Sequence, residues 1–303
     1  MKQTRKLIAL LLAVIMMFCL TGCGSFEGKM AKAALKMQKL QSLRADISID
    51  LGLSMSMFGE AMDLDMTING PVDVIISPLQ GKADLSLNML DENLDILCYM
   101  EQKEGKLLVY ASTDEDDNWV KTEVDLSQFP ENGKLDTKGL AQLAKLAASF
   151  EESGTKTVKG SEASIYSGKV AWSELESTAD MESIMNTMAD SAGSGLDLSG
   201  LDFSQLGDIP LSIGVDNKSG MVVKYTMDLT EMMQSLLPMI MDAAVKAAMS
   251  ESGVSGLDGF DLSSLGLEFN LNKLTADAEL YDFDSVSEIV IPDAALNAEN
   301  IAA

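Results

Sequence analysis

The stretches ISIDLGLSMSM, residues 47–57, and MDLDMTI, residues 62–68, decide the fold of this chain. In both, apolar side chains alternate with serine, aspartate, threonine or glycine. Successive side chains of a strand point to opposite faces of a sheet, so a period of two predicts strands with one apolar and one polar face. Gly59 and Glu60 lie between the stretches and predict a turn. The chain is therefore expected to form a long antiparallel hairpin with one face in a hydrophobic core.

The same alternation continues through the first part of the chain. It predicts seven consecutive strands, over residues 47–57, 62–68, 72–77, 83–89, 94–100, 106–111 and 119–126. Asn69-Gly70-Pro71 is the expected turn between the second and the third. Further strands are expected at 156–159, 163–172, 209–215, 221–229, 267–271 and 276–282. Consecutive strands with short turns predict an antiparallel meander.

Helical spacing recurs in four segments between these strands. The apolar residues repeat every three or four positions within residues 29–43, 140–150, 173–188 and 230–248. The last segment is apolar nearly all round, and such a helix must be covered. It is either buried against the sheet or forms a lid over a cavity, and both interpretations stay open.

Charge and composition exclude several classes of function. The 303-residue chain has a net charge of −25, which argues against nucleic acid as a partner because phosphate binding needs clustered Lys and Arg. It has no histidine, which removes Ser-His-Asp catalysis and His-ligated zinc. The acidic run Asp114–Asp117 lacks the spacing of a calcium loop and is interpreted as a hairpin turn. We therefore expect neither an enzyme nor a metal site, and no cofactor.

The N-terminus resembles a bacterial lipoprotein signal peptide. A basic start (Lys2, Arg5, Lys6) precedes the apolar run Leu7–Leu20. That run of 14 residues is too short to cross a bilayer as a helix. It ends in Leu20-Thr21-Gly22-Cys23, and in prolipoproteins the matching cysteine is acylated and becomes the first mature residue. The resemblance implies a signal peptide over 1–22, lipidation of Cys23, a tether over 23–28, and a lipid-anchored protein on the extracytoplasmic face of a bacterial cell membrane.

Next to this tether lies an amphipathic helix with a lysine face. Lys29, Lys32, Lys36 and Lys39 share one side, opposite Met30, Ala33, Ala34, Met37 and Leu40. The lysines either rest on anionic headgroups or form a solvated face while the apolar side docks on the sheet. The two interpretations are compatible. Further along, Cys98 lies in an apolar alternation and is expected to be a small buried hydrophobe.

Methionine supplies the candidate ligand-binding residues. The chain has 21 methionines but only 5% aromatic residues. Methionine is flexible and polarizable, so a methionine-lined space adapts to irregular apolar ligands such as acyl chains. The alternative is an ordinary core filled with Met in place of Phe. The candidate lining residues are Met55, Met57, Met62, Met66, Met89, Met100, Met181, Met185, Met188, Met233 and Met241.

Together, the Cys23 motif, the first amphipathic helix, the meander, and the later strand pairs ending in Ile289-Val290-Ile291-Pro292 resemble the LolA/LolB and LppX-type lipoproteins. The resemblance implies an α+β fold, with a strongly curved antiparallel sheet forming an incomplete barrel and helices covering its concave face. It implies one domain over 29–292, with 293–303 as a polar tail. It also implies non-enzymatic binding of an apolar or acylated ligand. The alternative is an envelope protein-protein interaction module with a solid core and an acidic outer face.

Overall fold

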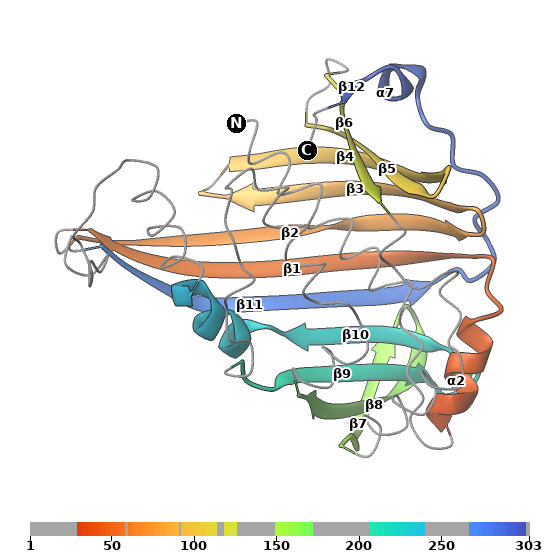
Figure 1. Ribbon diagram of the computed structural model, residues 1–303. Helices are drawn as coiled ribbons and strands as arrows, with labels where there is room; N and C mark the ends of the chain where they lie inside the picture. Colours follow the sequence, from red (N-terminus) through yellow and green to blue (C-terminus); the bar gives the residue numbers. More distant parts are fainter. Residues whose placement is uncertain are drawn as a thin grey trace.

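The computed structural model describes residues 29–57, 60–90, 92–113, 118–125, 149–171, 206–239 and 267–300. Their strands form one sheet in the order β12-β6-β5-β4-β3-β2-β1-β11-β10-β9-β8-β7, open at β12 and at β7 (Figure 1). Neighbouring strands are antiparallel except for β12 and β6, which are parallel. A large, curved, open antiparallel sheet is therefore confirmed. Its strands are β1 (Ser42–Met57), β2 (Glu60–Ile76), β3 (Leu79–Met89), β4 (Glu92–Lys103), β5 (Lys106–Ser112), β6 (Val120–Asp125), β7 (Glu151–Val158), β8 (Ser161–Val170), β9 (Ile209–Asp216), β10 (Val222–Asp228), β11 (Leu267–Tyr281) and β12 (Glu299–Asn300).

The expected turn at Asn69-Gly70-Pro71 is wrong, because β2 runs unbroken through it. The register with β3 passes from Asn69↔Ser86 to Val72↔Ala83 and leaves Gly70 and Pro71 without a partner there. Proline has no N–H to donate, so this is the place in a central strand where it is tolerated. Gly70 has φ +154°, and an added Cβ would lie 2.1 Å from the Asp84 carbonyl oxygen. Here Gly-Pro marks a close approach of two strands, and six strands rather than seven form the first meander.

The two closing strands expected at 267–271 and 276–282 are also one strand, β11. Its register with β1 shifts between Gly52 and Leu53, which pair with Lys273 and Leu271. Asn272 is the extra residue of this bulge. Residues 272 and 273 are polar and interrupt the alternation of apolar and polar side chains. A bulge changes the alternation for one residue without ending the strand, so one strand has the sequence pattern of two.

Helix α2 (Lys29–Met37) confirms the first amphipathic helix, although it ends before residue 43 because β1 begins at Ser42. Residues 230–239 form the described start of the last predicted helix. The predicted helix at 173–188, residues 140–148 and residues 240–248 lie outside the described residues, as do residues 1–28 and 114–117. Coverage of the concave face by helices is therefore not established by the described residues.

The sheet has two chemically distinct faces. Ile47 lies opposite Gly70 on β2 and Ala278 on β11, and Ile49 lies opposite Ile68 and Ala276. We call the face that carries these side chains the apolar face. Its buried core extends over β1–β5, β9–β11 and α2, where Ala33 and Met37 pack with the strand residues. Cys98 belongs to this core, and burial raises the pKa of its thiol to about 12, as expected for an unreactive structural cysteine.

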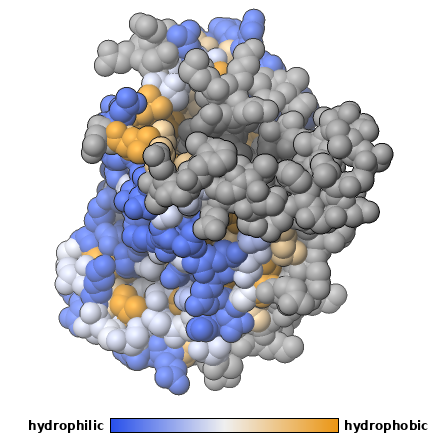
Figure 2. Space-filling view, turned by 90° about the vertical axis from the view of Figure 1, so that its left-hand side faces the viewer, coloured by the Kyte–Doolittle hydropathy of each residue, from blue (hydrophilic) through white to orange (hydrophobic). Residues whose placement is uncertain are grey.

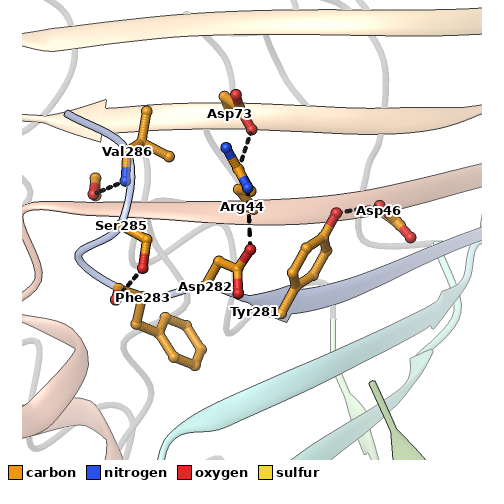
Figure 3. A network of polar contacts seen from close by, with 9 residues as sticks. Arg44, Asp46, Asp73, Tyr281, Asp282, Phe283, Ser285 and Val286 are labelled. Carbon is orange, nitrogen blue, oxygen red and sulfur yellow. Dashed lines mark hydrogen bonds and ion pairs between the residues drawn. The ribbon is translucent and has the colours of Figure 1, made fainter. Parts of the chain in front are cut away.

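The opposite face, here called the polar face, carries a smaller apolar cluster where the C-terminal segment crosses it. Val286 and Ile289 pack there with Tyr99, Leu108 and Tyr110. The backbone N–H of Val286 donates to Ser42 Oγ at 3.0 Å (Figure 3). The segment continues into α7 (Asp293–Leu296) and β12, so the residues expected to form a polar tail add a helix and a strand to the sheet edge.

The close approach at Gly70 gives the first prediction. Gly70→Ala forces a Cβ against the Asp84 carbonyl, so we expect the free energy of unfolding to fall by about 3 kcal/mol. At Gly207 an added Cβ meets no atom within 4 Å, so Gly207→Ala should change it by less than about 0.5 kcal/mol. Urea unfolding of both variants measures the difference. Equal effects would contradict the close approach.

Candidate functional site

The side chains of the apolar face become more exposed to solvent toward one end of the strands. On β2, Val74 and Val72 are buried, Met66 is half-buried, and Met62 is 58% exposed. On β3 and β4 the same direction leads from the buried Ala83 and Cys98 to Met89 and Leu94, which are 36% and 39% exposed. We call this part of the apolar face, carried by residues 53–56, 62–66, 87–89 and 92–94, the methionine end. Neighbouring large apolar side chains that are exposed on a protein surface mark a candidate binding site for a ligand or a partner.

The strand pairing brings several predicted methionines together at this end. Met55 lies directly opposite Met62 on β1 and β2, and Met66 lies opposite Met89 on β2 and β3. Directly paired side chains on one face are near neighbours, so the thioethers form two cross-strand pairs. Met57 occupies the last position of β1, opposite Glu60.

Other predicted residues lie elsewhere. Met100 is only 1% exposed and belongs to the buried core, which places it among the packing residues rather than at the methionine end. Met233 is half-buried in the 230–239 helix. Met181, Met185, Met188, Met241 and Cys23 lie outside the described residues.

The 230–239 helix is fixed to β11 near the methionine end. The Leu274 N–H donates to Thr230 Oγ1 at 2.9 Å, and Gln234 Nε2 donates to the Leu271 carbonyl at 2.7 Å. Met232 and Leu236 are buried, so the helix has a docked side. In Figure 1 it lies beside the part of β11 that is remote from α2. The helix therefore borders the methionine end on the β11 side.

Helix α2 lies at the other end of the strands (Figure 1). Lys29 Nζ donates to the Tyr166 hydroxyl at 3.3 Å, and Lys36 Nζ donates to the Ser219 carbonyl. Two of its three lysines thus contact the β8–β10 region while Ala33 and Met37 enter the core. Docking of the apolar side on the sheet, one of the two interpretations of this helix, is confirmed.

The polar face is strongly charged, but many of its carboxylates are paired with cations of the same face. Arg44 bridges Asp73 and Asp282 at 3.1 Å each (Figure 3). Lys224 lies 3.2 Å from both Asp277 and Glu279; burial alone would lower its pKa, but the two carboxylates outweigh burial and raise it.

Asp46 is held by a second arrangement on this face. It binds Lys159 and accepts a hydrogen bond from the Tyr281 hydroxyl at 2.8 Å. Burial would raise the pKa of Asp46, but these partners outweigh burial and lower it. The pKa of Tyr281 is raised to about 12 by burial and by the same hydrogen bond. These groups bind one another, which leaves them less available to an external partner.

Sequence reasoning missed two residues of the methionine end, Glu92 and Leu94, which lie at the start of β4. It also missed Leu90 next to them, which directly follows β3 and is 60% exposed. Glu92 lies opposite Met89, on the apolar face. The alternation of Leu94, Ile96 and Cys98 was enough to place Glu92 on the apolar face, since residues two positions apart in a strand share a face. It did not show that this end of the strand is the uncovered one.

The ion pairs predict how stability depends on pH. Lys273 lies 2.9 Å from Asp50, and chiefly its hydrogen bond lowers the pKa of this carboxyl below the ordinary value of 3.8. A lowered folded-state pKa stabilises the protein above pH 3.8, and the gain is lost as pH falls through the folded value. Asp50→Asn should therefore cost about 0.5 kcal/mol at pH 7 and almost nothing near pH 2. Urea unfolding at both pH values tests this; a cost that stays constant with pH contradicts it.

Among the residues described, no group of three His, Cys, Asp or Glu side chains is placed to hold a metal ion. None of the helices in the described ranges is long and apolar enough to cross a membrane. What the methionine end offers chemically is an apolar contact surface.

Solved structures similar to the chain include lipoproteins of the type expected from the sequence. The lipoprotein LppX from Mycobacterium tuberculosis is 11% identical, with a TM-score of 0.37 over 86% of this chain and 96% of that chain. LprF from Mycobacterium bovis is 11% identical, with a TM-score of 0.39 over 87% of this chain and 93% of that chain. A putative outer membrane lipoprotein-sorting protein domain from Vibrio parahaemolyticus is 9% identical, with a TM-score of 0.14 over 80% and 87% of the two chains.

No curated protein matches the chain in sequence. One family model does match, over residues 27–254, which span α2 and every strand from β1 to β10. The chain therefore belongs to the family described as "Family of unknown function (DUF6612)".

Proposed function

We propose that this protein is a membrane-anchored lipoprotein of the bacterial cell envelope that binds an apolar or acylated ligand without catalysing a reaction. The ligand lies on the apolar face of the sheet and reaches it from the methionine end. The observation that carries the proposal is the exposure of large apolar side chains there, above all Met62, within a face that is otherwise a buried core.

The length of this face suits an extended apolar chain. β1 and β2 have 16 and 17 residues, and a strand rises about 3.3 Å per residue, so the face runs for about 50 Å. The part between Met62 and Ile68 carries only apolar side chains on this side of β2. Methionine and leucine there can adjust their rotamers to a ligand of irregular shape.

Two further parts of the proposal concern segments outside the described residues. Helices predicted at 140–150, 173–188 and 240–248 cover the concave face and leave a lipophilic space against the sheet. Acylation of Cys23 anchors the protein on the extracytoplasmic side of the membrane. In support, the signal-like segment precedes α2 by only a few residues, and α2 is docked on the sheet.

The alternative function, an interaction module that works through its acidic outer face, has less support. Four carboxylates of the polar face, on β1, β2 and β11, are engaged by Arg44, Lys159, Lys224 and Lys273. An external cationic partner would have to displace these pairs, whereas an apolar ligand at the methionine end displaces only water.

A charge placed on the exposed methionine tests the ligand site. Met62→Asp puts a carboxylate on the apolar face, and we expect binding of the fluorophore N-phenyl-1-naphthylamine to weaken at least about tenfold because a buried charge is costly. Ser56→Asp is the matched control, since Ser56 is close by in the register but on the polar face. Fluorescence titration measures both. Equal loss in the two variants, or none in Met62→Asp, would count against the site.

The anchor is tested separately in the cell. Cys23→Ala removes the thiol that receives the lipid, so we expect unprocessed precursor to accumulate and the mature form to disappear from the membrane fraction. Radiolabelled palmitate should label the wild type but not the variant. Processing and labelling that persist in Cys23→Ala would exclude lipidation at this residue.

A further inference from the structure

Helix α2 has an exposed side that the ligand site does not use. Leu35 lies on this side and is 50% exposed. The opposite side of the helix is buried in the core. We call the exposed side, together with the lysine two residues after the helix, the outer side of α2. It consists of Leu35 and four exposed lysines: Lys29, Lys32, Lys36 and Lys39.

These lysines differ from the cations of the polar face. Arg44, Lys224 and Lys273 each bind a carboxylate of the protein. None of the four lysines forms an ion pair with a carboxylate in the parts of the chain that the structure describes. Residues 29–43 also contain no Asp or Glu. Positive charge is therefore left exposed at this helix, in a chain whose net charge is −25.

The neighbouring turn between β9 and β10 extends this positive area. Lys36 Nζ donates to the Ser219 carbonyl, so the turn lies against α2. Lys218 belongs to the same turn and is exposed. Its ammonium group adds to the charge of the outer side.

The other end of the strands carries the opposite sign. Neither residues 62–66 nor residues 92–95 contain Lys or Arg. The exposed carboxylates there are Asp63, Asp65, Glu92 and Asp95. Figure 2 looks onto this end and shows hydrophilic atoms around smaller hydrophobic areas. The charge is therefore polarised along the strands, with exposed lysines gathered at α2.

We propose, on the basis of the anchor given above, that the outer side of α2 rests on the anionic head groups of the membrane that holds Cys23. Residues 23–28 span about 20 Å even when fully extended, so the helix begins within that distance of the bilayer. A lysine beside an anionic bilayer strengthens binding about fivefold. The acidic end then points away from lipids that would repel it. The acylated cysteine supplies the attachment, and the lysines supply the orientation.

Leu35 and the tether favour a bilayer over a soluble polyanion as the partner. Leu35 follows Lys32 by three residues and precedes Lys39 by four, so these side chains are neighbours on the helix surface. At a membrane surface an apolar side chain reaches the acyl boundary while lysines keep their ammonium groups among the phosphates. A polyanion in water would contact the lysines and leave Leu35 exposed.

Binding to vesicles tests the contact without the anchor. The mature chain with Cys23→Ala carries no lipid, so its binding comes from the protein surface. We expect it to bind vesicles of phosphatidylcholine with about 30% phosphatidylglycerol at least about tenfold more tightly than vesicles of phosphatidylcholine alone. Sedimentation of the vesicles at low salt measures both affinities. In about 0.5 M NaCl the difference should fall to within about twofold because the charges are screened.

A double variant of the Cys23→Ala chain assigns the binding to α2. Lys32→Gln with Lys39→Gln removes two charges from the outer side and should weaken binding to the anionic vesicles at least about tenfold. The control, Lys169→Gln with Lys273→Gln, makes the same change in net charge and should alter binding less than about twofold. Lys169 pairs with Pro210 at the start of β9, away from the β9–β10 turn, and Lys273 lies in the middle of β11.

A third variant of the same chain separates the bilayer from a polyanion. Leu35→Gln removes apolar surface without changing the charge, so it should weaken vesicle binding about threefold. The substituted side chains of all three variants are exposed, and urea unfolding midpoints close to that of the parent chain would show that each is folded.

The outcomes separate this inference from the function on which it rests. If anionic vesicles are bound no better than neutral ones, or if the control weakens binding as much as Lys32→Gln with Lys39→Gln, the inference is overturned while the anchor and the ligand site stand or fall by their own tests. If Leu35→Gln binds as tightly as the parent chain, the lysines act alone and the bilayer assignment is overturned. If palmitate fails to label the wild type, the anchor fails, and vesicle binding in the expected pattern still supports contact of α2 with lipid.

Discussion

The structure depends on the pairing of β1 with β11. β1 is the central strand, with β2 on one side and β11 on the other, and β11 follows it by more than 200 residues in the sequence. This pairing joins two halves of the sheet, β2–β6 and β7–β10, which would otherwise be separate hairpin arrays. Such a contact costs much loop-closure entropy, so it needs extensive compensation. The paired residues of β1 and β11, which extend over nearly the full length of β1, provide this compensation.

Side chains on both faces reinforce this junction. On the apolar face, Ala45 and Ile47 pack in the core with Leu280 of β11. On the polar face, Arg44 holds Asp73 of β2 and Asp282, which directly follows β11, so one guanidinium spans three adjacent segments. Exposed ion pairs add little stability by themselves. Their value here is that they pair carboxylates that would repel one another in a chain with a net charge of −25.

The alternation of apolar and polar residues was enough to predict most of the strands and their two faces, because parity alone assigns each side chain of a strand to one face. It missed β12, which lies in the expected polar tail, and the first part of β7, which begins at Glu151 and not at residue 156. It also failed where a local irregularity resembled a turn. Asn69-Gly70-Pro71 has turn chemistry but sits in a gap of the β2–β3 register, and Asn272 is a bulge rather than a break. Neither can be recognised without the partner strand. The pairing of β1 with β11 could not be predicted either, since the local sequence pattern of a strand does not specify a partner so far along the chain.

The candidate site shows the same division between local and long-range information. Methionine positions and their face follow from the sequence, and Met55, Met62, Met66 and Met89 do share one end of the apolar face. Which methionines are covered depends on what packs over each strand end. Met100 has the same parity as Leu94, yet one is buried and the other exposed because they lie at opposite ends of β4. Exposure is a property of position along the strand, which only the assembled sheet defines.

The direction of the strands then connects the site to the proposed anchor. The segment before α2 leads to Cys23, and α2 docks near the start of β1, whereas the methionine end lies at the finish of β1. Sixteen strand residues separate these ends by about 50 Å. Six residues of tether, fully extended, add about 20 Å at most between Cys23 and the helix. An anchored molecule whose strands stand away from the bilayer would therefore present its open apolar end to the exterior and not to its own membrane.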